Sequence, residues 1–270
     1  MQEDRSLFIR EGEGFLGNPC AAGPWSPNAL AGGSILALMG HVLEDLPTVT
    51  PMSLSRITVD MFRPAPRNEP IKVETSIRRE GKKLQVVDIA ITAGGTEYAI
   101  ARALRLRNAD IAGFLDPASQ PLQNEVFPQV PPPPEYAKLM PPNSGTGFIP
   151  RGIDFVRALE LVDGPNTIWM RLRVPVIEGE AVRATSLAVV PMDVVNLIGF
   201  ALDIRKVTAI NADVSAHITR YPVGEWIAIT GNTRVDPELG HGVSMGIMSD
   251  CLGVFGHTSM AQIVDSVAGK

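Results

Sequence analysis

Two segments of the chain are apolar almost all round a helix, and each is followed by segments in which apolar and polar residues alternate. The apolar segments are residues 28–46, NALAGGSILALMGHVLEDL, and 185–203, TSLAVVPMDVVNLIGFALD. A helix that is apolar nearly all round must be wrapped by the rest of the fold. Alternation with a period of two is typical of strands that bury one face. The pattern therefore predicts one wrapped helix and one antiparallel sheet, twice.

The alternating segments occupy corresponding places after the two helices. Each series begins with a strand that closes on arginine and proline, and the two arginines, Arg63 and Arg220, are 157 residues apart. Such self-similarity indicates an internal duplication. The expected fold class is α+β, a double hotdog: two tandem hotdog repeats, each an antiparallel sheet wrapped on one long apolar helix, with the sheets joined. The expected strands are 57–64, 71–79, 82–92 and 96–107, then 215–222, 226–235, 242–250 and 253–264.

Prolines mark a connector between the two halves. Ten of the 23 prolines lie between residues 117 and 150, and residues 131–134 are four in a row. Consecutive prolines favour an extended polyproline conformation rather than a packed element. We therefore predict an N-terminal hotdog at 1–107, a Pro-rich connector at 108–150 and a C-terminal hotdog at 151–270.

Charge and composition exclude several classes of protein. The net charge of −5 leaves no basic field for a phosphodiester backbone, so no nucleic-acid partner is expected. The apolar segments are shorter than a membrane span, and the acidic start MQEDRSLFIREGEG is unlike a signal peptide, so we expect no membrane span and a cytoplasmic location. Cys20 and Cys251 are expected to be buried thiols. The four histidines are scattered, so no metal site is predicted.

The most regular alternation, INADVSAHITR at 210–220, places an aspartate, a serine and a histidine on one strand face. Asp213, Ser215 and His217 suggest a hydrolase triad. A nucleophilic serine, however, needs a sharp turn and nearby oxyanion donors, and the chain has no GxSxG motif. A polar face that lines solvent or a contact between chains explains the trio better, so a homo-oligomer is possible.

Asp193 is the single carboxylate within LAVVPMDVVNLIGFAL. A charge in so apolar a segment is costly unless it is paired or a task requires it. The alternative is structural, because Pro191 suits the first turn of a helix and an acid just after it favours the helix dipole. The residues alone leave both readings open.

The first half of the chain resembles a known family. GPWSPNALAGGSILALM at 23–39 and the segment from LSRITVDMFRPAP at 54 to ARALRLR at 107 resemble the N-terminal half of double-hotdog acyl-CoA thioesterases of the thioesterase II type, in the thioesterase-like superfamily. The second half matches more loosely, through a helix bearing an aspartate, a strand ending in Arg-Pro-like residues and a final strand with a glutamine.

The resemblance implies a set of site residues. In that family an Asp, a Ser or Thr, and a Gln hold the attacking water, and these positions fall on Asp193, Asn211 and Gln262. Asn211 departs from the pattern, since asparagine can hydrogen-bond water but cannot relay a proton as a hydroxyl can. Amides near the first helix start are expected to polarise the thioester carbonyl, which makes Gly32 and Gly33 candidate substrate-binding residues.

The sequence therefore predicts an enzyme of lipid metabolism that hydrolyses an acyl-CoA thioester to free acid and CoA. The water would be held by Asp193, Asn211 and Gln262, no metal or organic cofactor is needed, and the partner would be acyl-CoA or a similar small molecule. The alternative is a non-catalytic or repurposed double hotdog that binds an acyl-CoA or another apolar ligand, since Asn211 replaces the hydroxyl. A hydratase or dehydratase ranks last, because it would need an Asp and His pair near one helix start.

Overall fold

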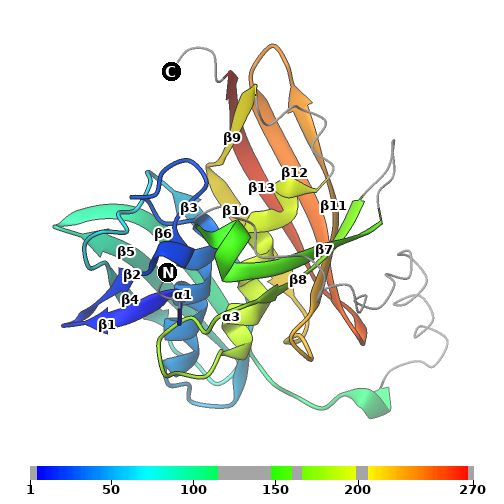
Figure 1. The fold of residues 1–270 in the computed structure, drawn as a ribbon. Helices are drawn as coiled ribbons and strands as arrows, with labels where there is room; N and C mark the ends of the chain where they lie inside the picture. The colour runs from blue at the N-terminus through cyan, green and yellow to red at the C-terminus, as the bar shows by residue number, and fades with distance from the viewer. Residues whose placement is uncertain (1–4, 115–146, 160–165, 199–205, 267–270) are drawn as a thin grey trace.

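One antiparallel sheet runs through both halves of the chain (Figure 1). The computed structural model describes residues 5–114, 147–159, 166–198 and 206–266. Within them an 11-stranded sheet has the order β4-β5-β6-β3-β10-β13-β12-β11-β8-β7, and β9 pairs with β13. Strands β3 and β10 join the two halves, with Val59 opposite Val214. The predicted double hotdog with joined sheets is confirmed.

The strands of the first half are β3 Met52–Met61, β4 Lys72–Arg79, β5 Leu84–Ala93 and β6 Thr96–Arg107. Those of the second half are β7 Ile153–Leu159, β8 Asn166–Leu172, β9 Val207–Asn211, β10 Asp213–Ile218, β11 Ile227–Asp236, β12 His241–Asp250 and β13 Gly253–Ser266. A separate hairpin precedes α1, made of β1 Phe8–Glu11 and β2 Gly14–Gly17. Short helical turns cover Pro19–Ala21, Ala112–Phe114 and Phe148–Gly152.

The internal duplication is visible in the strand positions. β12 begins 157 residues after β5, and β13 begins 157 residues after β6. The same spacing separates Arg63 from Arg220. Most of the predicted connector, residues 115–146, lies outside the described residues, so the domain boundaries at 107 and 150 stay a prediction.

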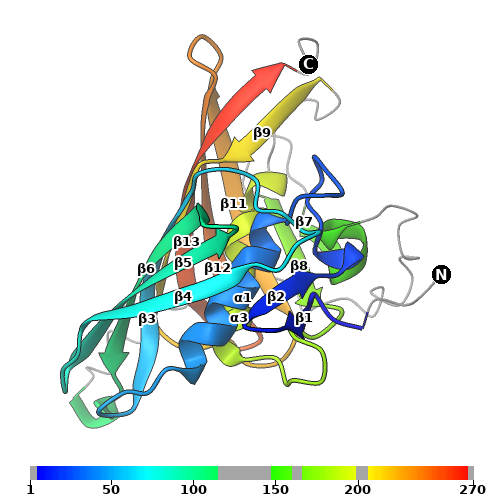
Figure 2. The same ribbon diagram turned by 90° about the vertical axis from the view of Figure 1, so that its left-hand side faces the viewer.

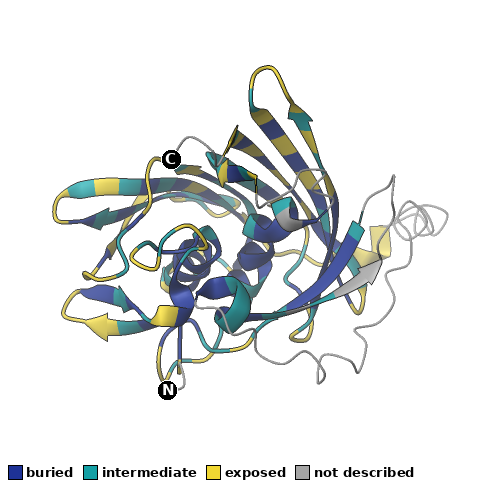
Figure 3. Cartoon of the chain, turned by 45° about the horizontal axis from the view of Figure 1, so that its top comes forward, coloured by how far each residue is buried: buried dark blue, intermediate teal, exposed yellow. Residues whose placement is uncertain are grey.

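The helices lie inside the curve of the sheet, as Figures 2 and 3 show from two further sides. Helix α1, Gly32–Asp45, is almost wholly buried, with Leu36, Leu38 and Met39 fully excluded from solvent. Helix α3, Ala184–Val189, crosses it where the Ser186 hydroxyl donates to the Ala37 carbonyl at 2.8 Å. Each half of the sheet thus wraps an apolar helix, and the outer face of the sheet carries the exposed side chains.

The second helix is shorter and more irregular than the continuous helix predicted over 185–203. The α-helix ends at Val189, and a 3₁₀ helix, η6 Val190–Leu197, continues it. Pro191 lies at the start of η6, and proline has no N–H to continue the α-helical hydrogen bonds. Residues 199–205 lie outside the described part of the chain.

The strand predicted over 210–220 breaks at Ala212, and its two parts bury opposite sets of positions. Asn211 lies opposite Gln262, whereas Ser215 lies opposite Ser259, so β9 and β10 together hold one residue more than β13 across the break. Such a bulge turns the following side chains to the other face of a sheet. As a result Ile210 is 40% exposed, against the prediction that it is buried, and Asn211 faces the helices.

The two cysteines differ in exposure. Cys20 is buried as predicted, but Cys251 is exposed, because it lies in the turn between β12 and β13. Among the described residues, no helix is long and apolar enough to cross a bilayer.

Candidate active site

Asp193 lies where the second-half helix meets the start of α1. Its carboxylate oxygen Oδ2 accepts a hydrogen bond from the Gly33 backbone N–H at 2.7 Å, and Oδ1 accepts one from Asn211 Nδ2 at 2.7 Å. Gly33 belongs to the first half of the chain, and Asp193 and Asn211 belong to the second. The site is therefore assembled from both halves.

Asn211 connects Asp193 to Gln262. Gln262 Nε2 donates to Asn211 Oδ1 at 3.0 Å, and Asn196 Nδ2 donates to the same oxygen at 3.1 Å. Asn196 follows Asp193 by three residues in η6, and three residues make one turn of a 3₁₀ helix, so the two side chains share one side of it. The structure thus brings together the three side chains that the sequence predicted and adds Asn196.

A pair of hydroxyls extends the network beyond Gln262. Ser244 Oγ on β12 donates to Gln262 Oε1 at 2.9 Å, and Thr233 Oγ1 on β11 lies 2.6 Å from Ser244 Oγ. Ser244 and Thr233 are directly opposite each other in the sheet. Sequence reasoning missed both residues. Their only signal was a polar residue at a strand position that faces the helix.

Two glycines that lack side chains let η6 approach the sheet closely. Gly231 and Gly246 are directly opposite each other on β11 and β12. A Cβ atom would lie 2.7 Å from Val195 Cγ2 at Gly231 and 2.6 Å from it at Gly246. No real Cβ makes contacts this short, so the two glycines let Val195 reach the sheet and bring η6 within hydrogen-bond reach of β9.

The environment of Asp193 favours its protonated form. Burial among apolar groups raises the pKa of Asp193 from 3.8 to about 6, against the opposing effect of the hydrogen bonds from Asn211 and Gly33. Asp193 as a whole residue is partly exposed, while its carboxyl group is surrounded by protein. A carboxyl with a pKa near neutrality is suited to accept and return a proton.

The raised pKa also weakens the folded state. The folded chain keeps the proton of Asp193 up to a pH of about 6, while an unfolded chain releases it near 3.8. Folding stability therefore falls as the pH rises between these two values, by roughly 3 kcal/mol in all. A residue kept at such a cost is typical of a functional site.

Gly32 and Gly33 both lie at the start of α1, but their amides have different roles. The Gly33 N–H donates to Asp193 and is not open to a substrate carbonyl at the same time. Gly32 occupies the first position of the helix, where backbone N–H groups have no partner within the helix. The geometry leaves Gly32 as the better donor for a carbonyl oxygen.

Comparison with known proteins agrees with this architecture. Residues 21–106 match the family model of the acyl-CoA thioesterase N-terminal domain. The first half of the chain is therefore similar to that domain. The resemblance to double-hotdog thioesterases of the thioesterase II type is thereby confirmed. No protein of curated function matches the chain.

Solved structures share the fold over the whole chain. A TesB protein of Mycobacterium avium subspecies paratuberculosis superposes with a TM-score of 0.67 at 15% identity, covering 96% of this chain and 95% of that chain. An acyl-CoA thioesterase II of Mycobacterium marinum gives 0.64 at 12% identity, covering 88% and 90%. A conserved protein of unknown function with a hot dog fold from Alicyclobacillus acidocaldarius gives 0.67 at 16% identity, covering 99% and 98%.

The part of the chain that matches the family model supplies the Gly32 and Gly33 backbone to the site. Gly32 and Gly33 lie within residues 21–106, whereas Asp193, Asn211 and Gln262 lie outside them. The structure brings all five residues together, and their catalytic roles stay a prediction.

Replacing Gly32 with alanine is expected to displace Asp193. A Cβ atom at Gly32 would lie 2.5 Å from Asp193 Oδ1. The carboxylate would have to leave its contact with Asn211, so we expect thioester hydrolysis to fall at least tenfold. Steady-state kinetics of Gly32→Ala checks this, with Gly113→Ala as the control, because a Cβ at Gly113 meets nothing within 4 Å. Equal losses in the two variants would contradict the prediction.

Asp213, Ser215 and His217, on β10, do not form a triad. Asp213 Oδ1 accepts a hydrogen bond from the Ala261 N–H at 2.6 Å, and Ser215 Oγ donates to Thr58 Oγ1 at 3.1 Å. His217 is exposed. Ser215 therefore contacts a hydroxyl on β3 and has neither a base nor an oxyanion donor of its own.

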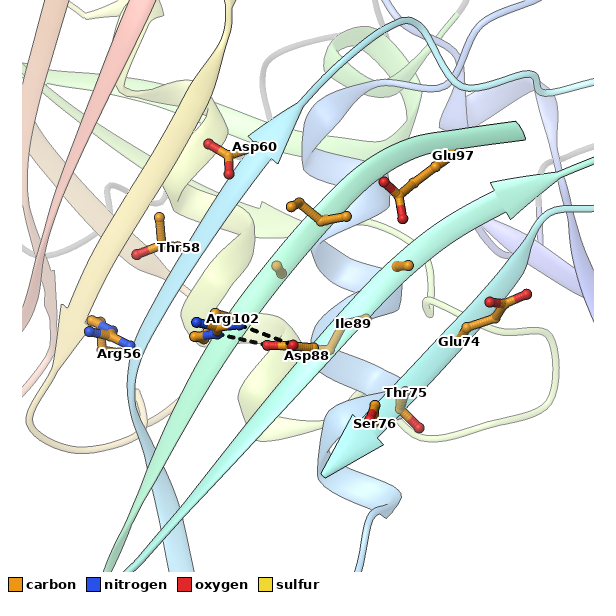
Figure 4. Close-up of a pocket in the computed structure, with 13 residues that line it drawn as sticks. Arg56, Thr58, Asp60, Glu74, Thr75, Ser76, Asp88, Ile89, Glu97 and Arg102 are labelled. Atoms are coloured by element: carbon orange, nitrogen blue, oxygen red, sulfur yellow. Dashed lines mark hydrogen bonds and ion pairs between the residues drawn. The ribbon is translucent and has the colours of Figure 1, made fainter. Parts of the chain in front are cut away.

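A depression of about 630 Å³ lies on the outer face of the first half of the sheet, over β3–β6 (Figure 4). Its lining includes Arg56, Asp88 and Arg102, and Asp88 pairs with Arg102 at 2.7 Å. The Asp193 network lies with the helices on the opposite side of the sheet. Mixed charges that pair with one another indicate a solvated surface. In the described part of the chain, no three or more His, Cys, Asp or Glu residues gather where they could hold a metal ion.

Proposed function

We propose that this chain hydrolyses an acyl-CoA thioester to the free acid and CoA. The observation that carries the proposal is the convergence of Asp193, Asn211 and Gln262 at the start of α1. A thioesterase N-terminal domain forms one wall of that site. The acyl-CoA partner follows from the family, and the cytoplasmic location, the role in lipid metabolism and the homo-oligomer stay predictions.

Asp193 is the general base of the proposed reaction. Its carboxylate takes a proton from a water molecule while the water oxygen attacks the thioester carbonyl carbon. The Gly32 N–H stabilises the negative charge that develops on the carbonyl oxygen. When the carbon–sulfur bond breaks, Asp193 returns the proton to the leaving thiolate, so the products are a carboxylic acid and a thiol.

Asn211 and Gln262 act as donors in this scheme. Asn211 Oδ1 already accepts hydrogen bonds from Asn196 and Gln262, so it has no further lone pair for a water proton. The second hydrogen of each amide group, on Asn211 Nδ2 and on Gln262 Nε2, would donate to the water oxygen in this scheme. Asp193 alone can accept the proton. Asn211 and Gln262 therefore orient the water, and Asp193 activates it.

The pH dependence of hydrolysis is expected to follow Asp193. Since the base must be ionised, kcat/KM should rise tenfold per pH unit below about 6, the pKa of Asp193, and level off above it. Measuring kcat/KM from pH 4.5 to 8.5 in buffers of constant ionic strength checks this. A profile that is flat across pH 6, or that falls above it, would contradict the role of Asp193.

A panel of acyl-CoAs of increasing chain length tests the proposal itself. Release of free CoA by the wild-type chain, detected with a thiol reagent, is the expected result. The alternative is a repurposed double hotdog that binds an acyl-CoA or another apolar ligand, favoured by the fully bonded Asn211 carbonyl in place of a hydroxyl. Measurable binding of acyl-CoAs without CoA release from any of them would support that alternative.

A further inference from the structure

We infer that Ser244 is a positioning residue of this site: its hydroxyl, supported by Thr233, holds the Gln262 amide in the orientation that makes Asn211 a donor to Asp193. The inference rests on the proposed function, because it concerns the geometry of the same base. Ser244 contacts neither Asp193 nor Asn211 directly and acts through Gln262.

Counting protons fixes the direction of the hydrogen bonds. The Ser244 hydroxyl has one hydrogen, which it donates to Gln262 Oε1. Thr233 must then be the donor in the 2.6 Å contact with Ser244. Every donor from Thr233 through Ser244, Gln262 and Asn211 thus points toward the Asp193 carboxylate, which can only accept when it is ionised.

The reverse orientation of the amides is unfavourable. If Gln262 turned its amide over, its oxygen would face Asn211 Oδ1 at about the present 3.0 Å, and two acceptors would oppose each other. If Asn211 turned over as well, its oxygen would face the Asp193 carboxylate. Asparagine and glutamine amides are nearly symmetric in shape, so their neighbours alone decide which way they point.

Burial makes the Ser244 hydroxyl hard to replace. Ser244 is completely buried and Gln262 is 3% exposed. Without the hydroxyl, Gln262 Oε1 would be a buried acceptor without a donor, which favours rotation of the side chain away from Asn211. Bonds in such a network strengthen one another, so the donation from Asn211 to Asp193 would weaken too.

The groups around Asp193 do not themselves titrate. Gly32 and Gly33 face it from α1, Asn211 faces it from β9, and Asn196 lies beside it in η6. A change in the titration of Asp193 therefore reports on these hydrogen bonds and on burial.

Kinetics of four variants tests the inference. We expect Ser244→Ala to lower kcat about tenfold with KM within twofold, and to move the acid limb of the pH profile upward by roughly half a unit, because a weaker hydrogen bond to the carboxylate raises its pKa. Ser244→Cys, which keeps the shape and a weak donor, should fall between wild type and Ser244→Ala, and Thr233→Val should show a smaller change. The control is Thr230→Val, which removes one hydroxyl of the buried pair that Thr167 and Thr230 form at 2.8 Å between β8 and β11.

A second measurement needs no turnover. The titration of the Asp193 carboxyl carbon can be followed by NMR in aspartate-labelled protein, with the resonance assigned from its absence in Asp193→Asn. An upward shift in Ser244→Ala but not in Thr230→Val supports the inference, even if wild type releases no CoA and the proposed function fails. The inference would be overturned if Ser244→Ala showed the same kinetics and the same Asp193 titration as the control Thr230→Val.

Discussion

Replacing Asp193 with asparagine is expected to abolish acyl-CoA hydrolysis, with kcat lower by about a thousandfold. A positioned general base contributes roughly 10² to 10⁴ in rate. The new side chain also loses one of its two hydrogen bonds, because its NH₂ group would face either the Gly33 N–H or Asn211 Nδ2, and both are donors. Release of free CoA from the best substrate of the panel measures the loss.

Asp213→Asn is the matched control for this variant. Like Asp193, Asp213 accepts a backbone N–H from another segment of the chain, here that of Ala261 at 2.6 Å. Asp213 lies beyond the bulge at Ala212 and does not contact the Asp193 network. We expect the kcat of Asp213→Asn to stay within about threefold of the wild-type value. If the two variants lose activity equally, or if neither does, Asp193 is not the base.

Replacing Arg220 with methionine is expected to destabilise the fold by about 3 kcal/mol, because it leaves a buried charge without its partner. Arg220 reaches Asp250 with two nitrogen atoms, at 2.5 and 2.7 Å, and the Asp250 side chain is completely buried. Asp250 also accepts hydrogen bonds from the backbone N–H groups of Val223 and Leu252. It therefore ties the loop between β10 and β11 to the turn between β12 and β13. A loss of this size corresponds to a melting temperature lower by roughly 10 °C.

Arg63→Met is the control, because Arg63 holds the same place in the first half of the chain. Arg63 is exposed, and surface charges contribute little to stability, so its removal should change the melting temperature by less than about 2 °C. Thermal unfolding of the two variants by circular dichroism at one pH and protein concentration makes the comparison. Equal melting temperatures for the two variants would contradict the structural role of Arg220.

The fold could be predicted from the sequence because the pattern repeats. Two apolar helices and two series of alternating strands at a spacing of 157 residues leave few arrangements other than two helices wrapped by joined sheets. The prediction failed locally where one residue changed the geometry. At Pro191 the second helix changes from an α-helix to a 3₁₀ helix. The predicted strand is interrupted at Ala212, although apolar and polar residues continue to alternate across this position. A one-residue bulge shifts the phase of a buried face, but Ile210 is exposed and Asn211 faces the helices, so the alternation of residue types continues across the break.

The site could be predicted only through the family resemblance. Strict alternation places Asn211 on the face of Asp213, whereas the bulge sets Asn211 toward the helices and leaves Asp213 on the outer face. Asn196, Ser244 and Thr233 escaped prediction because their roles depend on pairings across the sheet and across η6, which one sequence does not specify.

The spacing of 157 residues has a consequence for the symmetry of the chain. It relates Asp193 to Leu36, Asn211 to Leu54 and Gln262 to Arg105. Leu36 and Leu54 are packed in the core, and Arg105 is bonded to Gln85. The network of Asp193, Asn211 and Gln262 therefore has no equivalent at the three corresponding positions of the first half. The first half supplies its helix start to the same centre, so neither half holds all the parts alone, and the repeat that relates the strand positions does not extend to these three side chains.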